Sequence, residues 1–459
     1  MYRRGHIMVI LVTGEARERV PSHLDCLVGA ALPATRLGDP GVDEVLGRGE
    51  DYLVTGVYHS RRSLGRIGEQ HLGFDDLEER LGLSRTYSIQ IADPGRASDV
   101  VQRLRDLSVV ESASMQPLAV APFSVTSEHD ALPAGLDPWV AHDQVQARQG
   151  HGIEPGDQQV WVGLVDTGIS LPHPEFQRKL LAGYDTVRLG IGGDVGELRL
   201  VGSSHGDDFA PRDAVGHGSH VAGVVGAHGW HLPPGVAGHS LLLPVRVLAA
   251  ALDGASRKVV GVGSLPDINA GLKVAVDLGA DVLNLSFGTP ASVVPDGPPP
   301  HHDIVAYAAQ HGCTLVAAMG NSGQEEQYFP AAFPEVIAVG SVDADGHRSA
   351  FSTTGAHIAL SAPGEHIVSA GRHGYQAGSG TSYATPFVTG AAALLLARAR
   401  RHNRRLHGTE IRKLLMDSAS PLGGTGHSRE TGNGLLQVAS ALRMLDAALA
   451  SSTPPGSPL

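Results

Sequence analysis

The stretch GSGTSYATPFVTGAAALLLARA, residues 378–399, joins a glycine-rich turn to a long apolar run. Thr and Ser are common helix N-caps, and Pro is tolerated in a first helical turn, so the stretch predicts a helix that begins near Ser382. A helix that is apolar on all sides must be buried on all sides. We therefore expect this helix at the centre of the fold, with Ser382 held at its end.

Ser382 has two interpretations. The plainer one is a structural cap of the helix. The other is a nucleophile, because the preceding glycines let a substrate backbone approach and the amides of a helix start stabilise negative charge. A serine hydroxyl is a weak nucleophile unless a base takes its proton, so the second interpretation requires such a base elsewhere in the chain.

The composition indicates a globular protein that does not bind nucleic acid. The chain has 459 residues, enough for one large domain and a smaller one. It carries 35 basic and 47 acidic residues, a formal net charge of −12, and no basic block. Its two cysteines, Cys26 and Cys313, form neither a disulfide framework nor a CxxC metal motif.

The sequence predicts no membrane partner. The apolar run at residues 7–12 is shorter than the apolar centre of a secretory signal, and no segment is long enough and free enough of charge to cross a bilayer. We expect a cytoplasmic protein, with secretion by an atypical route as the alternative.

Beyond residue 160, short β-rich runs alternate with helical patterns. Buried strands are predicted at residues 160–165, 241–248, 281–287, 313–319 and 335–342, and helices at 218–229, 267–279 and 303–312. This alternation is typical of an α/β fold with a mostly parallel sheet and helices on both faces. In such sheets ligands bind beyond the carboxyl ends of the strands, so residues that follow a strand are the candidates for chemistry.

The chain before residue 160 is organised differently. Residues 86–92 alternate like a half-buried strand, 97–107 have helical spacing, and 109–120 are extended again, which predicts a small βαβ-like unit. The expected division is a region of unknown role (1–80), the small α/β module (81–122), a polar linker (123–137), the large domain (138–447) and a flexible tail (448–459).

Asp166 and His217 are the candidate acid and base. Asp166 directly follows the first buried strand, although Asp-Thr-Gly can also be a simple strand-ending turn. His217 opens a helix between glycines, and His220 follows three residues later. HxxH can bind a metal, but no further ligands stand nearby, and we expect no metal site. The general-base interpretation is better, because a buried carboxylate would orient the imidazole and stabilise its cation.

Asn321 adds a fourth candidate. It follows a buried strand and a glycine in AAMGNSG, where an Asn can tolerate a left-handed loop conformation. Its side-chain amide can also donate to an oxyanion. Each of these residues has a plain structural interpretation, but all of them in the order Asp, His, Asn, Ser rarely occur together by chance.

The chain resembles the subtilisin-like serine proteases in four motifs: VDTGI (165–169), GHGSHVAG (216–223), AAMGNSG (317–323) and GTSYATP (380–386). The similarity extends over residues 137–447. It implies that Asp166 orients His217, that His217 takes the proton of Ser382, and that Asn321 binds the oxyanion with the Ser382 amide. The chain departs from the family pattern at Ser219, Met319, Tyr383 and Thr385. These departures affect the expected shape of the site, but they remove no catalytic group.

The resemblance also implies a polypeptide substrate bound as an added strand. Its binding residues would be Ser286, Phe287, Gly288, Ala318, Met319 and Gly320. The 81–122 module resembles the prodomain of the same family, which folds as a small α/β unit and blocks the active site with its last strand; an unrelated interaction domain is the alternative. The resemblance implies no required cofactor and leaves calcium open, because the family's calcium ligands have no match in this chain.

We therefore expect a serine endopeptidase with an acyl-enzyme intermediate, whose N-terminal region is an intramolecular inhibitor. Residues 109–123 would lie in the substrate groove against residues 286–288, and the linker would be cut between about Phe123 and Asp137. Two rival hypotheses are a processing protease with one dedicated partner and a catalytically silent peptide-binding protein.

Overall fold

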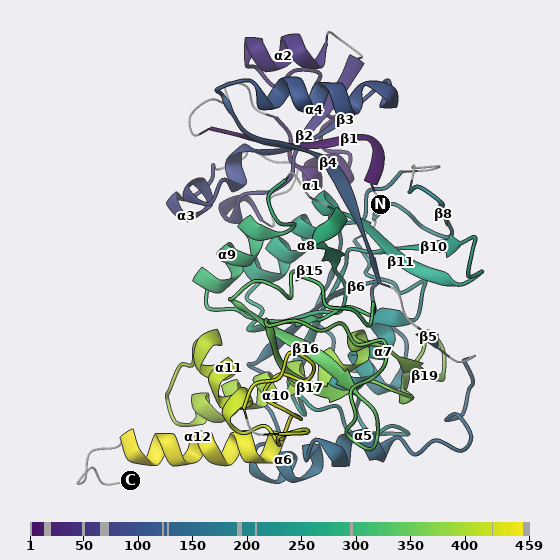
Figure 1. The fold of residues 1–459 in the computed structure, drawn as a ribbon, viewed down its shortest axis with the longest axis vertical. Helices are drawn as coiled ribbons and strands as arrows, with labels where there is room; N and C mark the ends of the chain where they lie inside the picture. Colours follow the sequence, from purple (N-terminus) through teal and green to yellow (C-terminus); the bar gives the residue numbers. More distant parts are fainter. Residues whose placement is uncertain are drawn as a thin grey trace.

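The computed structural model describes residues 2–12, 20–47, 51–64, 73–121, 124–125, 128–190, 195–206, 209–293, 297–424 and 426–452. These residues form a larger α/β unit and an N-terminal module stacked on one end of it (Figure 1). Among the described residues, no helix combines the length and the apolar character needed to cross a membrane.

The centre of the larger unit is a sheet of seven parallel strands in the order β17-β16-β14-β12-β6-β9-β7. Their bounds are Ile358–Pro363 (β17), Val336–Val342 (β16), Thr314–Ala318 (β14), Val282–Leu285 (β12), Trp161–Asp166 (β6), Leu241–Arg246 (β9) and Tyr184–Asp185 (β7). The five predicted strands are confirmed. The edge strands β17 and β7 are additions that the sequence analysis did not predict.

Helices cover both faces of this sheet, as expected. One face packs against α7 (His217–Gly226) and α10 (Thr381–Arg401), the other against α8 (Leu265–Asp277) and α9 (His302–Gln310). Val162 and Leu164 of β6 lie in the first core, whereas Val165 lies in the second. Successive residues of a strand point to opposite faces, so a strand between two helical layers must be apolar throughout.

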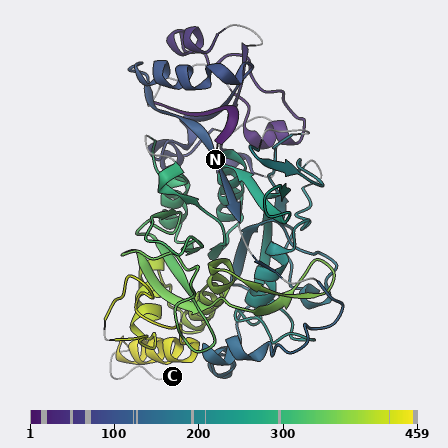
Figure 2. The same cartoon turned by 45° about the vertical axis from the view of Figure 1, so that its right-hand side comes forward.

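The remaining elements of this unit surround the core. They are α5 (Trp139–Gln144), α6 (Ala147–Ile153), α11 (Gly408–Asp417), α12 (Val438–Ser452), β13 (Thr289–Pro290), β15 (Tyr328–Phe329), β18 (Ile367–Ala370), β19 (Tyr375–Ser379) and the hairpin arm β8 (Leu198–Leu200), β10 (Ala249–Asp253) and β11 (Val259–Ser264). Figure 2 shows α12 at the end of the molecule opposite the N-terminal module.

The N-terminal module is an antiparallel sheet in the order β2-β3-β1-β4. Its strands are β1 (Tyr2–Leu11), β2 (Tyr52–Gly56), β3 (Thr86–Ile91) and β4 (Val110–Ala121). Its helices are α1 (His23–Leu27), α2 (Pro40–Leu46), α3 (Asp76–Arg80) and α4 (Ala97–Arg105), of which α2 and α4 cover one sheet face.

The division expected at residue 80 does not coincide with a break in this sheet. The predicted β3-α4-β4 order is present, but β1 from the chain's beginning lies between β3 and β4 and pairs with both. β1 is antiparallel to each, so β3 and β4 run parallel to one another with β1 between them. The sequence pattern predicted the strands but not this insertion.

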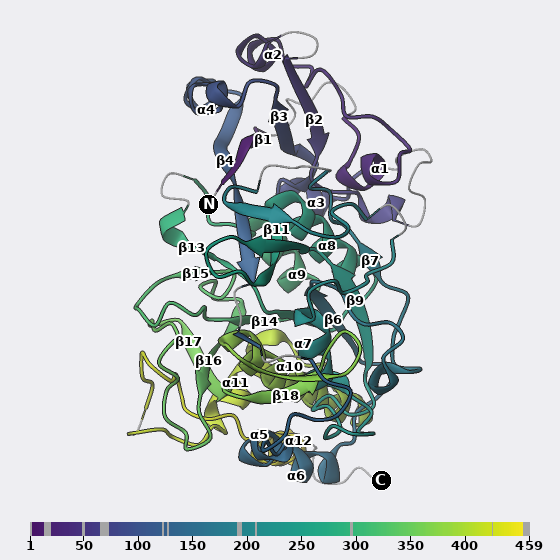
Figure 3. The same ribbon diagram turned by 90° about the vertical axis from the view of Figure 1, so that its right-hand side faces the viewer.

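Strand β4 links the module to the larger unit (Figure 3). Its first part pairs with β1, and Leu118, Val120 and Ala121 at its end pair antiparallel with β11. Val120 also forms a β-bridge with Gly288. The end of β4 therefore lies between two segments of the larger unit, which confirms the expected contact of residues 109–123 with Gly288.

The described part of the expected linker is attached to the larger unit. β5 (Ser124–Val125) pairs with β19, and His129 bridges to Tyr375. The Glu128 carboxylate accepts hydrogen bonds from the His373 and Gly374 amides. Residues 122–123 and 126–127 of the expected linker, and most of the expected tail, lie outside the described residues.

Candidate active site

Asp166 and His217 meet at the carboxyl end of the central sheet. Asp166 is the last residue of β6, and His217 is the first residue of α7. His217 Nδ1 lies 2.7 Å from Asp166 Oδ1, and both side chains are buried. The same carboxylate oxygen accepts the Thr167 amide at 2.7 Å. An acceptor at Nδ1 fixes the imidazole so that Nε2 is the nitrogen left for proton transfer.

Asp213 holds the loop from which α7 begins. Its Oδ1 accepts the amides of Val215 and Gly216 at 2.9 and 2.8 Å, and its Oδ2 accepts both the amide and the hydroxyl of Ser219. The Thr167 hydroxyl donates to the same carboxylate at 2.9 Å. Asp213 thus ties the start of α7 to the residue after Asp166. The sequence analysis did not single it out, although its position four residues before His217 was a usable indication.

Ser382 lies in the first turn of α10, which is buried along most of its length. Its hydroxyl donates to the Ser286 carbonyl at 3.0 Å, and the Ser286 hydroxyl donates to the Ser382 carbonyl at 2.8 Å. That carbonyl needs another donor because Pro386, four residues later, has no N–H. The Ser286 hydroxyl therefore replaces the helical hydrogen bond that the Ser382 carbonyl lacks because of Pro386.

Asn321 is oriented by Thr381. The Thr381 amide and hydroxyl both donate to Asn321 Oδ1 at 2.9 Å. This assigns the carbonyl end of the side chain, and its Nδ2 faces Gly380, where an added Cβ would lie 3.3 Å away. The donor end of Asn321 is thereby directed at the turn that precedes Ser382.

The sequence model of the subtilase family (Peptidase_S8) matches residues 157–434, more than half of the chain. The chain belongs to the subtilase family. It is 35% identical over 278 residues to the thermophilic serine proteinase of Bacillus sp. strain AK1, a match that covers 60% of each chain. It is 33% identical to subtilisin DY of Bacillus licheniformis, with 68% of this chain and 98% of the relative covered.

The fold of this subtilase is also that of a solved protease. The crystal structure of a lanthipeptide protease matches with a TM-score of 0.54 and 24% identity, over 70% of this chain and all of the other. At that identity the likeness concerns the fold alone. Residues before 157 lie outside the matched family region.

The predicted substrate-binding residues of the subtilase form two neighbouring segments. Ser286, Phe287 and Gly288 follow β12, and Ala318, Met319 and Gly320 end or follow β14, the adjacent strand. Phe287 and Met319 are buried in the core. Of these residues, Gly288 bridges to Val120 of the chain's own β4.

Tyr328 lies against both segments and was not singled out from the sequence. A Cβ added at Gly288 would lie 2.4 Å from the ring of Tyr328, and one added at Gly320 would lie 3.1 Å from it. The tyrosine is half-buried and comes from β15, which pairs with β13 directly after Gly288. It therefore occupies space beside the backbone that the predicted substrate contacts.

His220 does not join His217 in a metal site. Its Nε2 lies 2.9 Å from the Ile367 carbonyl, and its ring packs 4.0 Å from that of Tyr383. Burial lowers the pKa of His220 to about 3, so the ring is neutral. Tyr383, which departs from the family pattern, fills the core between His220 and His217.

The described residues contain one group that could hold a metal ion, Asp343, Asp345 and His347 in a surface loop after β16. Calcium takes six to eight oxygen ligands, and an imidazole nitrogen is a poor ligand for it. Asp343 Oδ1 is already bound to the amides of Asp345 and His347. This group does not fit calcium, and the calcium expectation stays a prediction without ligands.

Proposed function

We propose that this subtilase is a serine endopeptidase that uses Asp166, His217 and Ser382. The observation that carries the proposal is the buried 2.7 Å contact between His217 Nδ1 and Asp166 Oδ1. The ring of His217 also lies 5.4 Å from that of Tyr383, the residue after Ser382. A buried histidine paired in this way can accept a proton and be stabilised as a cation. The family's relatives are serine proteases, which supports the same chemistry.

In the proposed mechanism, Ser382 first leaves the Ser286 carbonyl by rotation about χ1 and donates to His217 Nε2. His217 takes the proton as Oγ attacks the substrate carbonyl, and returns it to the leaving amine. Water then hydrolyses the acyl-enzyme with the same base. The Asn321 amide and the Ser382 N–H stabilise the oxyanion, which needs donors aimed where charge develops.

The substrate would be an extended polypeptide, and β4 is the chain's own example. Its end pairs with β11 on one side and with Gly288 on the other, which is β-strand addition. A peptide and β4 cannot occupy this position together. We infer that the N-terminal module inhibits the enzyme until the chain is cut.

The geometry narrows the proposed cut. Ala121 pairs with Gly261 of β11, and Ser124 pairs with Ser379, three residues before the proposed nucleophile. Both ends of this short segment are therefore paired with strands of the larger unit. We propose a cut between Ala121 and Ser124, which overlaps the range expected from the sequence, Phe123 to Asp137, at the Phe123–Ser124 bond.

A fluorophosphonate probe tests this proposal. Protein freed of residues 1–121 should be labelled on Ser382, and Ser382→Ala should abolish both labelling and self-cleavage. Turnover should fall about a millionfold in Ser382→Ala or His217→Ala, the magnitude known for subtilisin itself. Peptide binding without labelling in the freed protein would instead identify a silent peptide-binding protein.

A further inference from the structure

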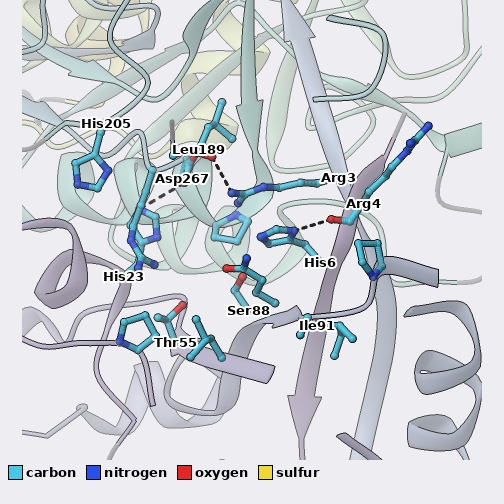
Figure 4. A pocket seen from close by; sticks show the side chains of 18 residues that line it. Arg3, Arg4, His6, His23, Thr55, Ser88, Ile91, Leu189, His205 and Asp267 are labelled. Atoms are coloured by element: carbon cyan, nitrogen blue, oxygen red, sulfur yellow. Dashed lines mark hydrogen bonds and ion pairs between the residues drawn. The ribbon is translucent and has the colours of Figure 1, made fainter. Parts of the chain in front are cut away.

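A cavity lies between the N-terminal module and the larger unit, away from the candidate active site (Figure 4). Its volume is about 510 Å³, within the range of small-ligand sites. Residues of β1, β2 and β3 form one wall, and the segments around Leu189, His205 and Asp267 form the other. Neither part of the molecule makes the cavity alone.

The walls are basic in a protein that is acidic overall. Six side chains with cationic or imidazole groups line the cavity: Arg3, Arg4, His6, His23, Arg188 and His205. Asp267 is the acidic residue among the described lining residues. Its Oδ1 lies 3.5 Å from His23 Nε2, and both side chains are buried. The three arginines thus form a local positive cluster on a chain whose formal net charge is −12.

Several of these side chains are held in place. Arg3 Nη2 donates to the Leu189 carbonyl at 3.0 Å across the two walls, and His6 Nδ1 lies 2.9 Å from the Arg4 carbonyl. His23 Nε2 lies 2.7 Å from the Thr186 carbonyl. Pre-positioned donors lose little side-chain freedom when they bind a ligand.

The arginines of the cavity act on its two buried titratable groups, and their charges favour an anion. Burial, followed by the charge of Arg188, lowers the pKa of His23 to about 3, and Arg3 and His205 act in the same direction. Burial raises the pKa of Asp267 to about 6, although Arg3 and Arg188 oppose that change. The arginine charges thus oppose a further cation in the cavity, whereas burial opposes ionisation of both His23 and Asp267.

We propose that this cavity binds a small multivalent phosphate anion that bridges the module and the larger unit. Guanidinium groups bind phosphate oxygens through paired hydrogen bonds, and donors on both walls suit a tetrahedral group better than a planar carboxylate. Ser88, Gln90 and Thr55 add neutral polar groups to the module's wall. An anion that contacts both walls stabilises the docked state by its binding free energy.

The test uses full-length Ser382→Ala protein, which keeps the chain whole, and tripolyphosphate as the probe. Calorimetry at constant ionic strength should give saturable binding of one anion per chain, with a higher thermal midpoint. Arg188→Gln should weaken binding about tenfold or more, and so should Arg4→Gln, which lies on an exposed strand end and should leave folding intact. Arg199→Gln on β8 removes the same charge outside the cavity and should have no effect.

Three results would overturn the proposal: no saturable binding by the full-length protein, binding of wild-type strength in both Arg4→Gln and Arg188→Gln, or a loss in Arg199→Gln as large as in those two variants. Citrate that binds as tightly as tripolyphosphate would overturn the assignment to phosphates. The binding measurement needs no protease activity, so its outcome is independent of the proposed catalytic function.

Discussion

Tyr328 limits the room for a substrate side chain beside Gly288 and Gly320. Its ring lies so close to both glycines that a Cβ at Gly288 would overlap it. A peptide paired with Gly288 would place the side chain before the cleaved bond near this ring. We therefore expect the enzyme to prefer a small residue at that position, which favours a narrow range of substrates.

Tyr328→Ala should open this space. The measurement is the ratio of kcat/KM for a peptide with Phe before the cleaved bond to kcat/KM for the same peptide with Ala there. On the activated enzyme, Tyr328→Ala should raise this ratio at least about tenfold, because a large side chain no longer meets the ring. Tyr184→Ala on the far edge strand β7 is the matched control and should leave the ratio unchanged. An unchanged ratio in Tyr328→Ala would place the binding space elsewhere.

At the scale of elements, helix α7 presents His217 only if its first turn is held. Asp213 does this by accepting amides and hydroxyls on both carboxylate oxygens. Asp213→Asn replaces one oxygen by an NH₂ group that faces donors, so at least one of these bonds is lost. We expect kcat to fall at least about tenfold with KM nearly unchanged, because a slight displacement of the base affects the chemical step.

Asp213→Glu separates positioning from charge, since it keeps the carboxylate and moves it by one methylene. For both Asp213 variants and the wild type, kcat and KM are measured by steady-state kinetics, and stability is measured by thermal unfolding of the same samples. Lost stability with normal kcat in the folded fraction would show that Asp213 acts on the fold alone.

Helix α5 carries a histidine that makes the fold sensitive to acid. His142 is buried against Phe387 of α10, and burial lowers its pKa to about 4. Between pH 4 and its ordinary value near 6.5, the unfolded chain binds a proton that the folded chain does not. Stability from this residue is therefore complete above about pH 6.5 and is lost as the pH falls toward 4.

His142→Phe should remove this dependence. From pH 7 to pH 4, the free energy of unfolding of the wild type should fall about 3 kcal/mol more than that of the variant, following the shift from 6.5 to about 4. Urea unfolding at each pH gives both curves. Parallel curves would mean that His142 titrates normally in the folded protein.

At the scale of the whole molecule, the module docks through buried polar contacts as well as through β4. Tyr58 OH donates to Asp303 Oδ2 at 2.7 Å and accepts from Asn269 at 3.0 Å. Lys273 of α8 pairs with Glu78 of the module at 2.6 Å, with both side chains buried. Such contacts are costly to leave unpaired, so they favour one docked arrangement.

Tyr58→Phe should weaken this docking. Added to an enzyme that begins near Ala134, fragment 1–122 should inhibit, and the variant fragment should inhibit about tenfold less well, because the Asp303 carboxylate loses a donor. Tyr52→Phe is the matched control, since the Tyr52 hydroxyl binds Asp43 within the module. No inhibition by the wild-type fragment would leave an accessory domain in place of an inhibitor.

The sequence by itself determined the five inner strands of the central sheet and the candidate site residues. Parallel strands buried on both faces are nearly continuous apolar runs. Asp166 and Asn321 follow such runs, and Ser382 stands where a helix pattern begins. These are local properties of the chain. They predict that an element exists and where it stops, which is enough to bring strand-end residues to one edge of a parallel sheet.

Only the tertiary structure decided which elements meet. Three features join segments that are far apart in the chain. They are the insertion of β1 between β3 and β4, the position of the end of β4 between β11 and Gly288, and the basic cavity. A period of two residues predicts a strand but carries no information about its partner, because backbone hydrogen bonds are alike for every sequence. Pairing is set by which edges remain open and which surfaces can be buried together, and both exist only after the rest of the chain has folded.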